Sequence, residues 1–392
     1  MKTMPLGELL ADAQTGFACG REDEAGIFQF RMNNVTNESA LDLSKRRRVP
    51  ADAHKNLGNF FVAQDDVLFN ATNSPENVGK SVLVPELDEK AVFSNHFIRL
   101  RTDRHKLLPA YLWRWLQWSF GRGVFSAMCR QWVNQATVSR EGLLGLEVPL
   151  PPLDEQRRIA AILDRATAVR AKQSQVQNHL AALPEAIFLA MFGDPEDSVA
   201  AGSVVRFGEV ADLQGGRNLV ADDQEAASPY RVLKISAVTS GCFKPAESKA
   251  LPADYVPPAD HLVRHGDLLI SRANTTELVG AVAYADEVPD NLVLPDKIWR
   301  FMWRNPYSSP VYYRSLFRTA SVRRRISQLA SGTGGSMKNI SKAKLVQLEL
   351  PQVSIAQQQE FARRVAAIPH PTLSETDALL KSLQSRAFSG QL

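Results

Sequence analysis

The sequence has little of the chemistry that marks secreted, zinc-binding or membrane proteins. Its 392 residues include three cysteines, Cys19, Cys129 and Cys242, which show neither paired nor metal-type spacing. This usage argues against a disulfide framework and against a zinc site, and it is typical of a reducing compartment. No apolar run approaches the length of a membrane span, and the chain does not open on a basic segment followed by an apolar core. We therefore expect a cytoplasmic protein that does not enter a membrane.

Catalytic motifs are missing or incomplete. There is no GxxxxGK[ST] phosphate loop, and the seven histidines form no ligand pair. Asn305-Pro306-Tyr307 lacks the second proline of the amino-methyltransferase motif, and no glycine-rich turn for S-adenosylmethionine precedes it. Pro295-Asp296-Lys297 lacks the acid-x-lysine element of a metal-dependent nuclease. These absences favour a protein that is not an enzyme and that binds no cofactor or metal of its own.

Net charge is also small, since 46 Lys and Arg face 42 Asp and Glu, giving +4. The basic residues are nevertheless clustered, and such clusters suit phosphate contacts. A solvated helix face or loop is the alternative interpretation of any one cluster. The clusters are Lys45-Arg46-Arg47-Arg48, the stretch with Arg99, Arg101, Arg104, His105 and Lys106, and Arg318 with Arg323-Arg324-Arg325.

What the chain does contain is an internal repeat. Leu6-Gly7-Glu8-Leu9 returns as Phe207-Gly208-Glu209-Val210, and Asp66-Val67-Leu68-Phe69 returns as Asp267-Leu268-Leu269-Ile270. Further anchors recur at offsets of 201 to 203 over the whole length. Two similar units joined head to tail suit a partner that is itself two-fold or repetitive.

Each copy consists of an irregular part followed by a long helical segment. Residues 1–150 and 197–350 alternate short apolar runs with Gly, Pro and Asn, which predicts short strands such as Asn59–Val62 and Val232–Ile235. Helical pieces are expected around Ala110–Gln117 and Val311–Leu329. The aromatic run Tyr111, Trp113, Trp115 and Trp118 has helical spacing and is interpreted as core or helix-packing surface, not as a platform for stacking bases.

Residues 151–196 and 351–392 predict two helical spacers that pair with each other in antiparallel fashion. The first has an unbroken seam with spacings of three and four, typical of a coiled coil. Its positions are Ile159, Ile162, Ala166, Val169, Gln173, Val176, Leu180, Leu183 and Ile187. In the second, Ser354 and Gln357 form a capping-box signature. Pro369-His370-Pro371 interrupts its seam, so a kinked or two-piece helix is expected.

Polar segments that recur in both copies are the candidates for reading DNA. Asn, Gln and Arg can bond base edges in the major groove, while Thr, Ser and Lys suit phosphates. The alternative is that Asn, Ser and Gly simply make turns, and for Asn73 and Asn274 we favour that alternative. With the first basic cluster, the candidate set is Lys45, Arg46, Arg47, Arg48, Asn70, Thr72, Asn73, Arg130, Asn134, Gln135, Arg272, Asn274, Thr275, Thr333, Ser336, Lys338 and Asn339.

Two stretches carry a resemblance to a known family. Pro149-Leu150-Pro151-Pro152-Leu153-Asp154-Glu155-Gln156-Arg157-Arg158-Ile159, continuing to Phe188-Leu189-Ala190-Met191-Phe192-Gly193-Asp194-Pro195, resembles the specificity subunit of type I restriction-modification systems. So does the C-terminal Leu383-Gln384-Ser385-Arg386-Ala387-Phe388-Ser389-Gly390-Gln391-Leu392. The phrase that opens the first spacer is specific, whereas the irregular parts match the family only in outline.

The resemblance implies an α+β fold with a pseudo-two-fold internal repeat. Two similar target recognition domains of mixed short strands and helices, residues 1–150 and 197–350, would be separated by two long antiparallel coiled-coil helices, residues 151–196 and 351–392. Each domain would read one half of a bipartite site in double-stranded DNA. Two methyltransferase subunits would dock on the spacers and restriction/translocase subunits would join, so S-adenosylmethionine, ATP and Mg²⁺ belong to those partners. The rival hypotheses are a stand-alone DNA methyltransferase, opposed by the missing motifs, and a coiled-coil scaffold, opposed by the paired polar segments.

Overall fold

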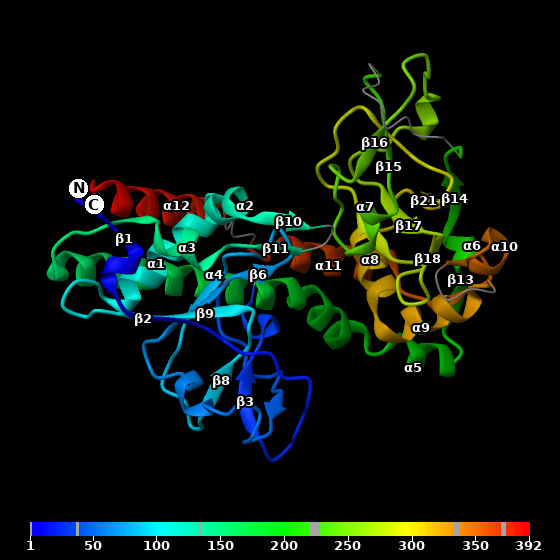
Figure 1. Ribbon diagram of the computed structural model, residues 1–392. Coiled ribbons are helices and arrows are strands. Elements are labelled where there is room, and N and C mark those ends of the chain that lie inside the picture. Colours follow the sequence, from blue (N-terminus) through cyan, green and yellow to red (C-terminus); the bar gives the residue numbers. More distant parts are fainter. Residues whose placement is uncertain (1, 37–38, 133–134, 219–227, 333–336, 370–373) are drawn as a thin grey trace. The chain divides into compact units, whose positions relative to one another are not determined.

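The protein is described here by a computed structural model, shown in Figure 1, which defines residues 2–36, 39–132, 135–218, 228–332, 337–369 and 374–392. The chain divides into two compact units. The first unit comprises residues 1–174 and 372–392, and the second unit comprises residues 175–371. The chain therefore passes between the units twice, at Ser174/Gln175 and at Pro371/Thr372.

Short strands and short helices build the first unit (Figure 1). The strands are β1 Thr3–Pro5, β2 Leu10–Thr15, β3 Ile27–Phe30, β4 Arg48–Val49, β5 Val67–Asn70, β6 Thr72–Asn73, β7 Ser81–Leu83, β8 Ala91–Phe93, β9 Phe97–Thr102, β10 Arg130–Trp132, β11 Gln135–Thr137 and β12 Glu147–Pro149. The helices are α1 Pro109–Gly121, α2 Val124–Met128, α3 Arg140–Leu144 and α12 Ser374–Ser389, with 3-10 turns at Leu6–Leu9, Met32–Asn34 and Leu57–Phe60. The long helix α4, Leu153–Phe192, begins in this unit.

The second unit repeats the pattern. Its strands are β13 Val204–Arg206, β14 Ala211–Gly215, β15 Arg231–Leu233, β16 Ser248–Ala250, β17 Leu268–Ser271, β18 Ala273–Asn274, β19 Val282–Tyr284, β20 Leu292–Val293, β21 Ile298–Trp303, β22 Lys338–Asn339 and β23 Glu349–Pro351. Its helices are α5 Pro195–Ala200, α6 Phe207–Val210, α7 Ser236–Thr239, α8 Pro310–Arg318, α9 Ala320–Leu329, α10 Lys342–Leu345 and α11 Ile355–Ala366, with a 3-10 turn at Ala259–His261.

Sheet topology matches between the units. The first has a four-stranded antiparallel sheet in the order β2-β9-β5-β7, and the second has β14-β21-β17-β19. Each unit also has a three-stranded sheet with one parallel pair, β4-β3-β8 and β16-β15-β20. A two-stranded sheet, β1-β12 or β13-β23, joins the start of each repeat to the segment just before its spacer helix. The internal repeat in the sequence is therefore a repeat of the fold, and the expected α+β class is confirmed.

Helix ends from distant parts of the sequence complete both cores. In the first unit the Phe388 ring packs on Tyr111, with ring centroids 5.5 Å apart. In the second, Phe188 packs on Tyr312, with centroids 5.6 Å apart, and on Phe361. Tyr111 and Tyr312 are equivalent in the repeat, and both are fully buried. The C-terminal helix α12 is thus part of the fold of the first unit, which agrees with the interpretation of the aromatic run as core.

One buried glutamine at the start of each spacer binds the N-terminus of a helix that precedes the spacer in the sequence. Gln156 is fully buried, and its side-chain carbonyl accepts from the Leu108 amide at 2.9 Å. Gln358 is 3% exposed, and its carbonyl accepts from the Ser309 amide at 3.1 Å. Leu108 and Ser309 are the residues before the first turns of α1 and α8, where amides have no intrahelical acceptor. Each glutamine therefore supplies the missing cap from another helix.

In the first unit, α4 and α12 run antiparallel. Arg158 donates to the main-chain oxygen of Leu392 at 2.7 Å, while Arg170, further along α4, pairs with Asp377, earlier in the sequence. This agrees with the antiparallel spacers expected from the sequence. The second spacer consists of two helices, α11 and α12, as Pro369 and Pro371 predicted, although residues 370–373 lie outside the described part. The capping box of Ser354 and Gln357 at the start of α11 is confirmed.

The seam of α4 separates into two rows with different exposure. The row Ile159, Ala166, Gln173, Leu180 and Ile187 is buried or half-buried. In the alternate row, Ile162 is half-buried, but Val169, Val176 and Leu183 are 52%, 49% and 39% exposed. One row suffices for packing within the units, and the other leaves apolar surface in solvent.

None of the described helices combines the length and the apolar content that crossing a bilayer would require.

One predicted strand is wrong. Residues 57–60 form a 3-10 turn, and Phe61 and Val62 continue without regular structure. The reason is that the Phe61 carbonyl accepts from the guanidiniums of Arg99, at 2.7 Å, and Arg101, at 3.1 Å. A carbonyl engaged in this way is not available to a strand ladder.

Candidate nucleic-acid interface

Strand pairing in the first unit brings two of the candidate segments together. β6 pairs antiparallel with β11, so that Asn73 lies opposite Ala136 and Thr72 lies opposite Thr137. The hydroxyls of the two threonines are 3.2 Å apart. β11 pairs in turn with β10, which completes a three-stranded sheet that contains Thr72, Asn73 and Gln135.

The second unit repeats this arrangement. β18 pairs antiparallel with β22, which places Ala273 opposite Asn339 and Asn274 opposite Lys338. Two segments about 60 residues apart in sequence are thus adjacent in both copies, at equivalent places of the repeat. The sequence singled out the segments, but only the tertiary structure pairs them.

Asn73 and Asn274 make turns, as the sequence analysis favoured. Each side-chain carbonyl accepts from the amide of the next residue at 2.8 Å, Ser74 in the first unit and Thr275 in the second. Their carbonyl oxygens are therefore engaged, and the side-chain NH₂ groups remain as donors without a partner among the described residues. Such a group can bind an acceptor on a base or a phosphate.

Three candidates are exposed and have side chains that bond nothing in the described part of the chain. They are Gln135 on β11, Thr275 after β18 and Asn339 on β22. Gln and Asn carry both a donor and an acceptor, the combination that reads adenine bidentately. These residues have the chemistry and the access that base reading requires.

Other candidates are held by intramolecular contacts. Arg272 donates to the Asp296 carbonyl at 2.8 Å and to its carboxylate at 3.2 Å, above the ring of Trp299. Lys338 donates to the Gly332 carbonyl at 2.7 Å. Asn70 lies in β5 and is 1% exposed, because β5 is an inner strand of the four-stranded sheet. The structure thus places Asn70 in the core, away from the surface where DNA could touch it.

The first basic cluster is largely neutralised. Arg46 and Arg48 both pair with Glu89, at 2.6 and 2.7 Å, and Arg47 pairs with Glu22 at 2.6 Å. Lys45 is exposed without a described ion pair. This cluster lies on and just before β4, in the sheet β4-β3-β8, so it belongs to a different sheet from Thr72 and Gln135.

In the second basic stretch Arg99 and Arg101 are structural, whereas Arg104, His105 and Lys106 are exposed. Arg99 is 2% exposed and pairs with Asp12 at 2.6 Å, and Arg101 pairs with Asp66 at 2.7 Å. In the second unit Arg300 occupies the position of Arg99, is 4% exposed and pairs with Asp267 at 3.0 Å. The expectation that Arg99 could contact phosphates is wrong, because burial removes it from the surface.

For some candidate residues the structure describes no side chain. Asn134, Thr333 and Ser336 are not among the described residues, and for Arg130 only the backbone of β10 is described. Among the described residues no group of His, Cys, Asp or Glu could hold a metal ion.

Sequence reasoning missed Arg314, which lies beside Arg318 in the second unit. The available signal was an arginine at the position where the first copy has Trp113.

Comparison with known proteins shows what the chain is similar to. The family model described as "Type I restriction modification DNA specificity domain" matches residues 26–180. The same kind of protein recurs among the curated relatives, including the EcoKI type I restriction enzyme specificity subunit of Escherichia coli, 24% identical over 274 residues. The chain is therefore similar to type I specificity subunits, with the family model covering residues 26–180.

A second curated relative is also a specificity subunit. A Methanocaldococcus jannaschii protein assigned as the MjaX specificity subunit is 28% identical over 160 residues. The match covers 40% of this chain and 37% of that protein, and the EcoKI match covers 63% and 58%. The chain thus aligns with less than two thirds of the length of these relatives.

Solved structures of type I systems share the fold. A chain from a study of complex assembly and conformational transition of the type I R-M system matches with a TM-score of 0.59 at 18% identity, covering 100% of this chain and 98% of that one. The S subunit from M. genitalium matches with a TM-score of 0.52 at 14% identity, covering 99% and 94%. The likeness extends over both units of the specificity fold.

Proposed function

We propose that this chain is the DNA-reading subunit of a type I restriction-modification complex. Residues 1–150 and 197–350 act as target recognition domains, and each reads one half of a bipartite site in duplex DNA. Residues 151–196 and 351–392 act as spacers that fix the distance between the half-sites. Two methyltransferase subunits dock on the spacers, and restriction/translocase subunits join this assembly.

The observation that carries the proposal is the duplicated pairing of polar segments, β6 with β11 and β18 with β22. Each pair presents exposed amide or hydroxyl side chains, Gln135 in one unit and Thr275 and Asn339 in the other. A bipartite site needs two similar surfaces with different side chains, and this chain carries two. In the second unit the pair β18-β22 is a two-stranded ribbon, which is narrow enough to enter the major groove.

The subunit itself carries out no chemistry in this proposal. Asn305, the residue nearest to a methyltransferase motif, uses its side-chain carbonyl to accept from the Tyr307 amide at 2.9 Å, which makes a turn. S-adenosylmethionine, ATP and Mg²⁺ are then bound by the partner subunits. A stand-alone methyltransferase would need a catalytic constellation that the described residues do not offer.

The docking surface for methyltransferase subunits is the exposed row of α4. Val169, Val176 and Leu183 recur every seven residues on one helix and are 39% to 52% exposed. An apolar stripe with this spacing is the surface that a partner helix covers. We assign the partner helices to the methyltransferase subunits.

The purified chain tests the proposal directly. Incubated alone with labelled S-adenosylmethionine and duplex DNA, it should transfer no label, whereas the complex with its cognate methyltransferase subunit should methylate the DNA and shift one specific duplex in electrophoresis. Robust transfer by the chain alone would favour the methyltransferase alternative. A chain that binds the partner but never shifts DNA would favour the scaffold.

Val176→Asp should weaken methyltransferase binding at least tenfold, because it places a charge where about 1.5–3 kcal/mol of apolar burial is expected. The fold should be unaffected, since Val176 is 49% exposed in the chain itself. Calorimetric titration measures the affinity, and thermal unfolding checks the fold. Gln175→Asp, an exposed polar neighbour on the same helix, is the matched control and should bind normally. Equal binding by both variants would contradict docking on this row.

A further inference from the structure

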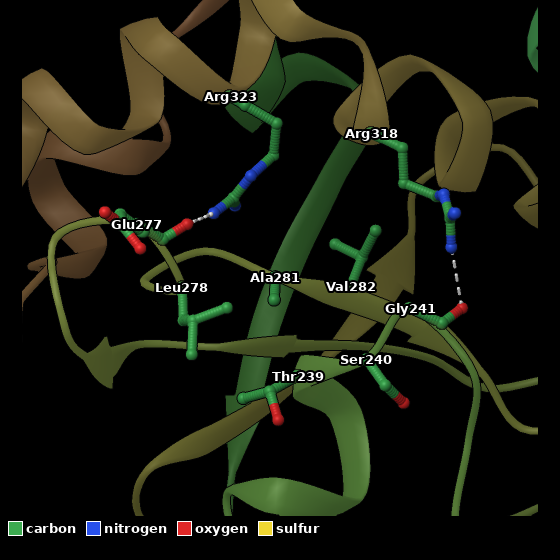
Figure 2. A pocket seen from close by; sticks show the side chains of 9 residues that line it. All are labelled: Thr239, Ser240, Gly241, Glu277, Leu278, Ala281, Val282, Arg318 and Arg323. Atoms are coloured by element: carbon green, nitrogen blue, oxygen red, sulfur yellow. Dashed lines mark hydrogen bonds between the residues drawn. The ribbon is translucent and has the colours of Figure 1, made fainter. Parts of the chain in front are cut away.

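A cavity of the second unit is lined by basic side chains that do not belong to the proposed base-reading segments. It has a volume of about 210 Å³ and opens to solvent. Figure 2 shows Arg318, at the end of α8, and Arg323, on α9, extending toward it from the same side, with Ala281 and Val282 below them. The residues around it are Thr239, Ser240, Gly241, Glu277, Leu278, Ala281, Val282, Arg318 and Arg323.

The arginines at this cavity are held by main-chain carbonyls and have no carboxylate partner in the described part of the chain. Arg318 donates to the Gly241 carbonyl at 2.9 Å, and Arg314 donates to the same oxygen at 3.0 Å. Arg323 donates to the Glu277 carbonyl at 2.8 Å, as the dashed line in Figure 2 marks. In contrast, Arg272, Arg300 and Arg304 of the same unit pair with Asp296, Asp267 and Asp212.

Burial makes the charges of Arg314 and Arg323 costly, whereas Arg318 is exposed. Desolvation lowers the pKa of Arg314 from its usual value, and the neighbouring Arg318 lowers it further, against a weaker opposing influence of Cys242 and Asp286. Desolvation also lowers the pKa of Arg323. One Nη atom of Arg323 and the Nε of Arg314 are buried without an acceptor. An anion in the cavity would supply a counter-charge and an acceptor for Arg323, which lines it.

The backbone is shaped to let Arg318 approach. Gly241 has φ +75°, and a Cβ at this position would lie 2.0 Å from the nearer terminal nitrogen of Arg318. Any other residue would displace the guanidinium and strain the turn. The position of the charge is therefore built into the loop after α7.

The first unit keeps only part of this arrangement. At the positions equivalent to Arg314 and Arg318, 201 residues earlier, it has Trp113 and Gln117, while Arg122 stands at the position equivalent to Arg323. Trp113 packs in place and donates its indole NH to the Ser81 carbonyl at 3.2 Å. The pair of Arg314 and Arg318 is thus particular to the second unit.

The cavity adjoins the candidate base-reading segment. Arg323 binds the Glu277 carbonyl, and the Ser327 hydroxyl on α9 donates to the Thr276 carbonyl at 3.0 Å. These contacts tie α9 to the turn that follows Asn274 and Thr275. The Glu277 carboxylate is the one negative group among the lining residues, against two guanidiniums, so the described lining favours an anion.

We propose that this cavity binds a backbone phosphate of the DNA half-site read by the second unit, with Arg318 and Arg323 as its ligands and Arg314 supporting Arg318. The inference rests on the proposed function, because it assigns the phosphate to DNA. Arginine and the hydroxyls of Thr239 and Ser240 are typical phosphate ligands. The contact orients the DNA beside Thr275 and Asn339 without reading sequence itself.

Arg318→Gln, which installs the residue of the first unit, should weaken binding about tenfold for specific and random duplex alike. The slope of log affinity against log salt should fall by about 0.9, as for the loss of one phosphate contact. Fluorescence anisotropy with the full chain in its methyltransferase complex measures both. Arg318→Lys should retain most of the slope, and Arg304→Gln, a partly exposed arginine paired with Asp212, should retain all of it.

A methylphosphonate scan of the duplex separates the possible outcomes. One neutral linkage, in the second half-site only, should weaken wild-type binding about tenfold and leave the Arg318→Gln complex unaffected. If the wild-type complex binds its site and no linkage shows this coupling, the phosphate proposal is wrong while the proposed function stands. If inorganic phosphate raises the melting temperature of the wild type but not of Arg318→Gln, and DNA binding is unchanged, the site serves a free anion and the DNA assignment fails. Absence of any DNA binding by the wild-type complex would instead refute the proposed function.

Discussion

Exchange of residues 197–350 for the corresponding part of another family member is expected to change one half of the recognised DNA sequence and to leave the other half unchanged. Each wrong base pair costs about 1–3 kcal/mol, so a hybrid should lose roughly a thousandfold in affinity for the original site once about three specified pairs differ. The physical reason is that each unit has its own sheets and its own hydrophobic cluster. Methylome sequencing of cells that carry the hybrid identifies the new site.

The junctions of such a hybrid follow from the packing. Phe188 and Phe361 lie outside the exchanged segment but pack into the second core, Phe188 against Tyr312. A hybrid whose exchanged segment has an aromatic residue at the position of Tyr312 should therefore fold. A hybrid whose exchanged segment lacks this aromatic residue tests whether the packing is needed. Reciprocal exchange of residues 1–150 should change the opposite half. Hybrids that fold but alter both halves would show that the units do not read independently.

Arg300→Met is expected to destabilise the second unit by about 3–5 kcal/mol, because it leaves the Asp267 carboxylate buried without its partner. Asp267 has a side chain that is 13% exposed, and the Arg300 side chain is 5% exposed. The Arg300 guanidinium, which the substitution removes, also donates to the Leu262 carbonyl and to the Gln214 side chain. Denaturant unfolding of the full chain should show an earlier transition for the second unit, with the first unit unchanged.

The control for this variant is another arginine of the same unit. Arg304 pairs with Asp212, and both side chains are more than half exposed, at 54% and 62%. An exposed pair contributes about 0–1 kcal/mol, so Arg304→Met should shift the transition little. Arg99→Met, the equivalent change in the first unit, should destabilise that unit instead. Similar small effects of Arg300→Met and Arg304→Met would mean that burial of the Arg300 ion pair has no energetic consequence.

Much of the architecture could be predicted from local pattern. Pro149 to Pro152 precede a helix because the first-turn amides need no acceptor, and α4 begins at Leu153. The helix ends at Phe192, and Gly193 follows with φ +69°. The Asp194 side chain then accepts from the Glu196 amide at 2.9 Å and caps α5. These signals act over a few residues, so they can be read without knowing the fold.

The candidate site could be predicted only in part, because exposure and pairing depend on residues far away in sequence. Asn70 and Asn73 looked alike in the sequence, but β5 is an inner strand and buries Asn70, whereas β6 is a short strand beside β11. The run Arg46-Arg47-Arg48 has the sequence of a phosphate-binding cluster, but in the fold Glu22 and Glu89 pair with its guanidiniums. A charge can be counted from the sequence, but its neutralisation by a distant carboxylate cannot.

The sequence by itself determined that the protein is a tandem repeat with a helical spacer after each copy, because the 201-residue offset and the seven-residue periodicity are properties of the chain alone. The tertiary structure decided which surfaces remain for partners. It covered one row of the α4 seam and left Val176 and Leu183 in solvent, and it joined β18 to β22 beside an uncompensated group of arginines. Both outcomes depend on long-range packing, which sets burial and charge pairing and which no local window of residues contains.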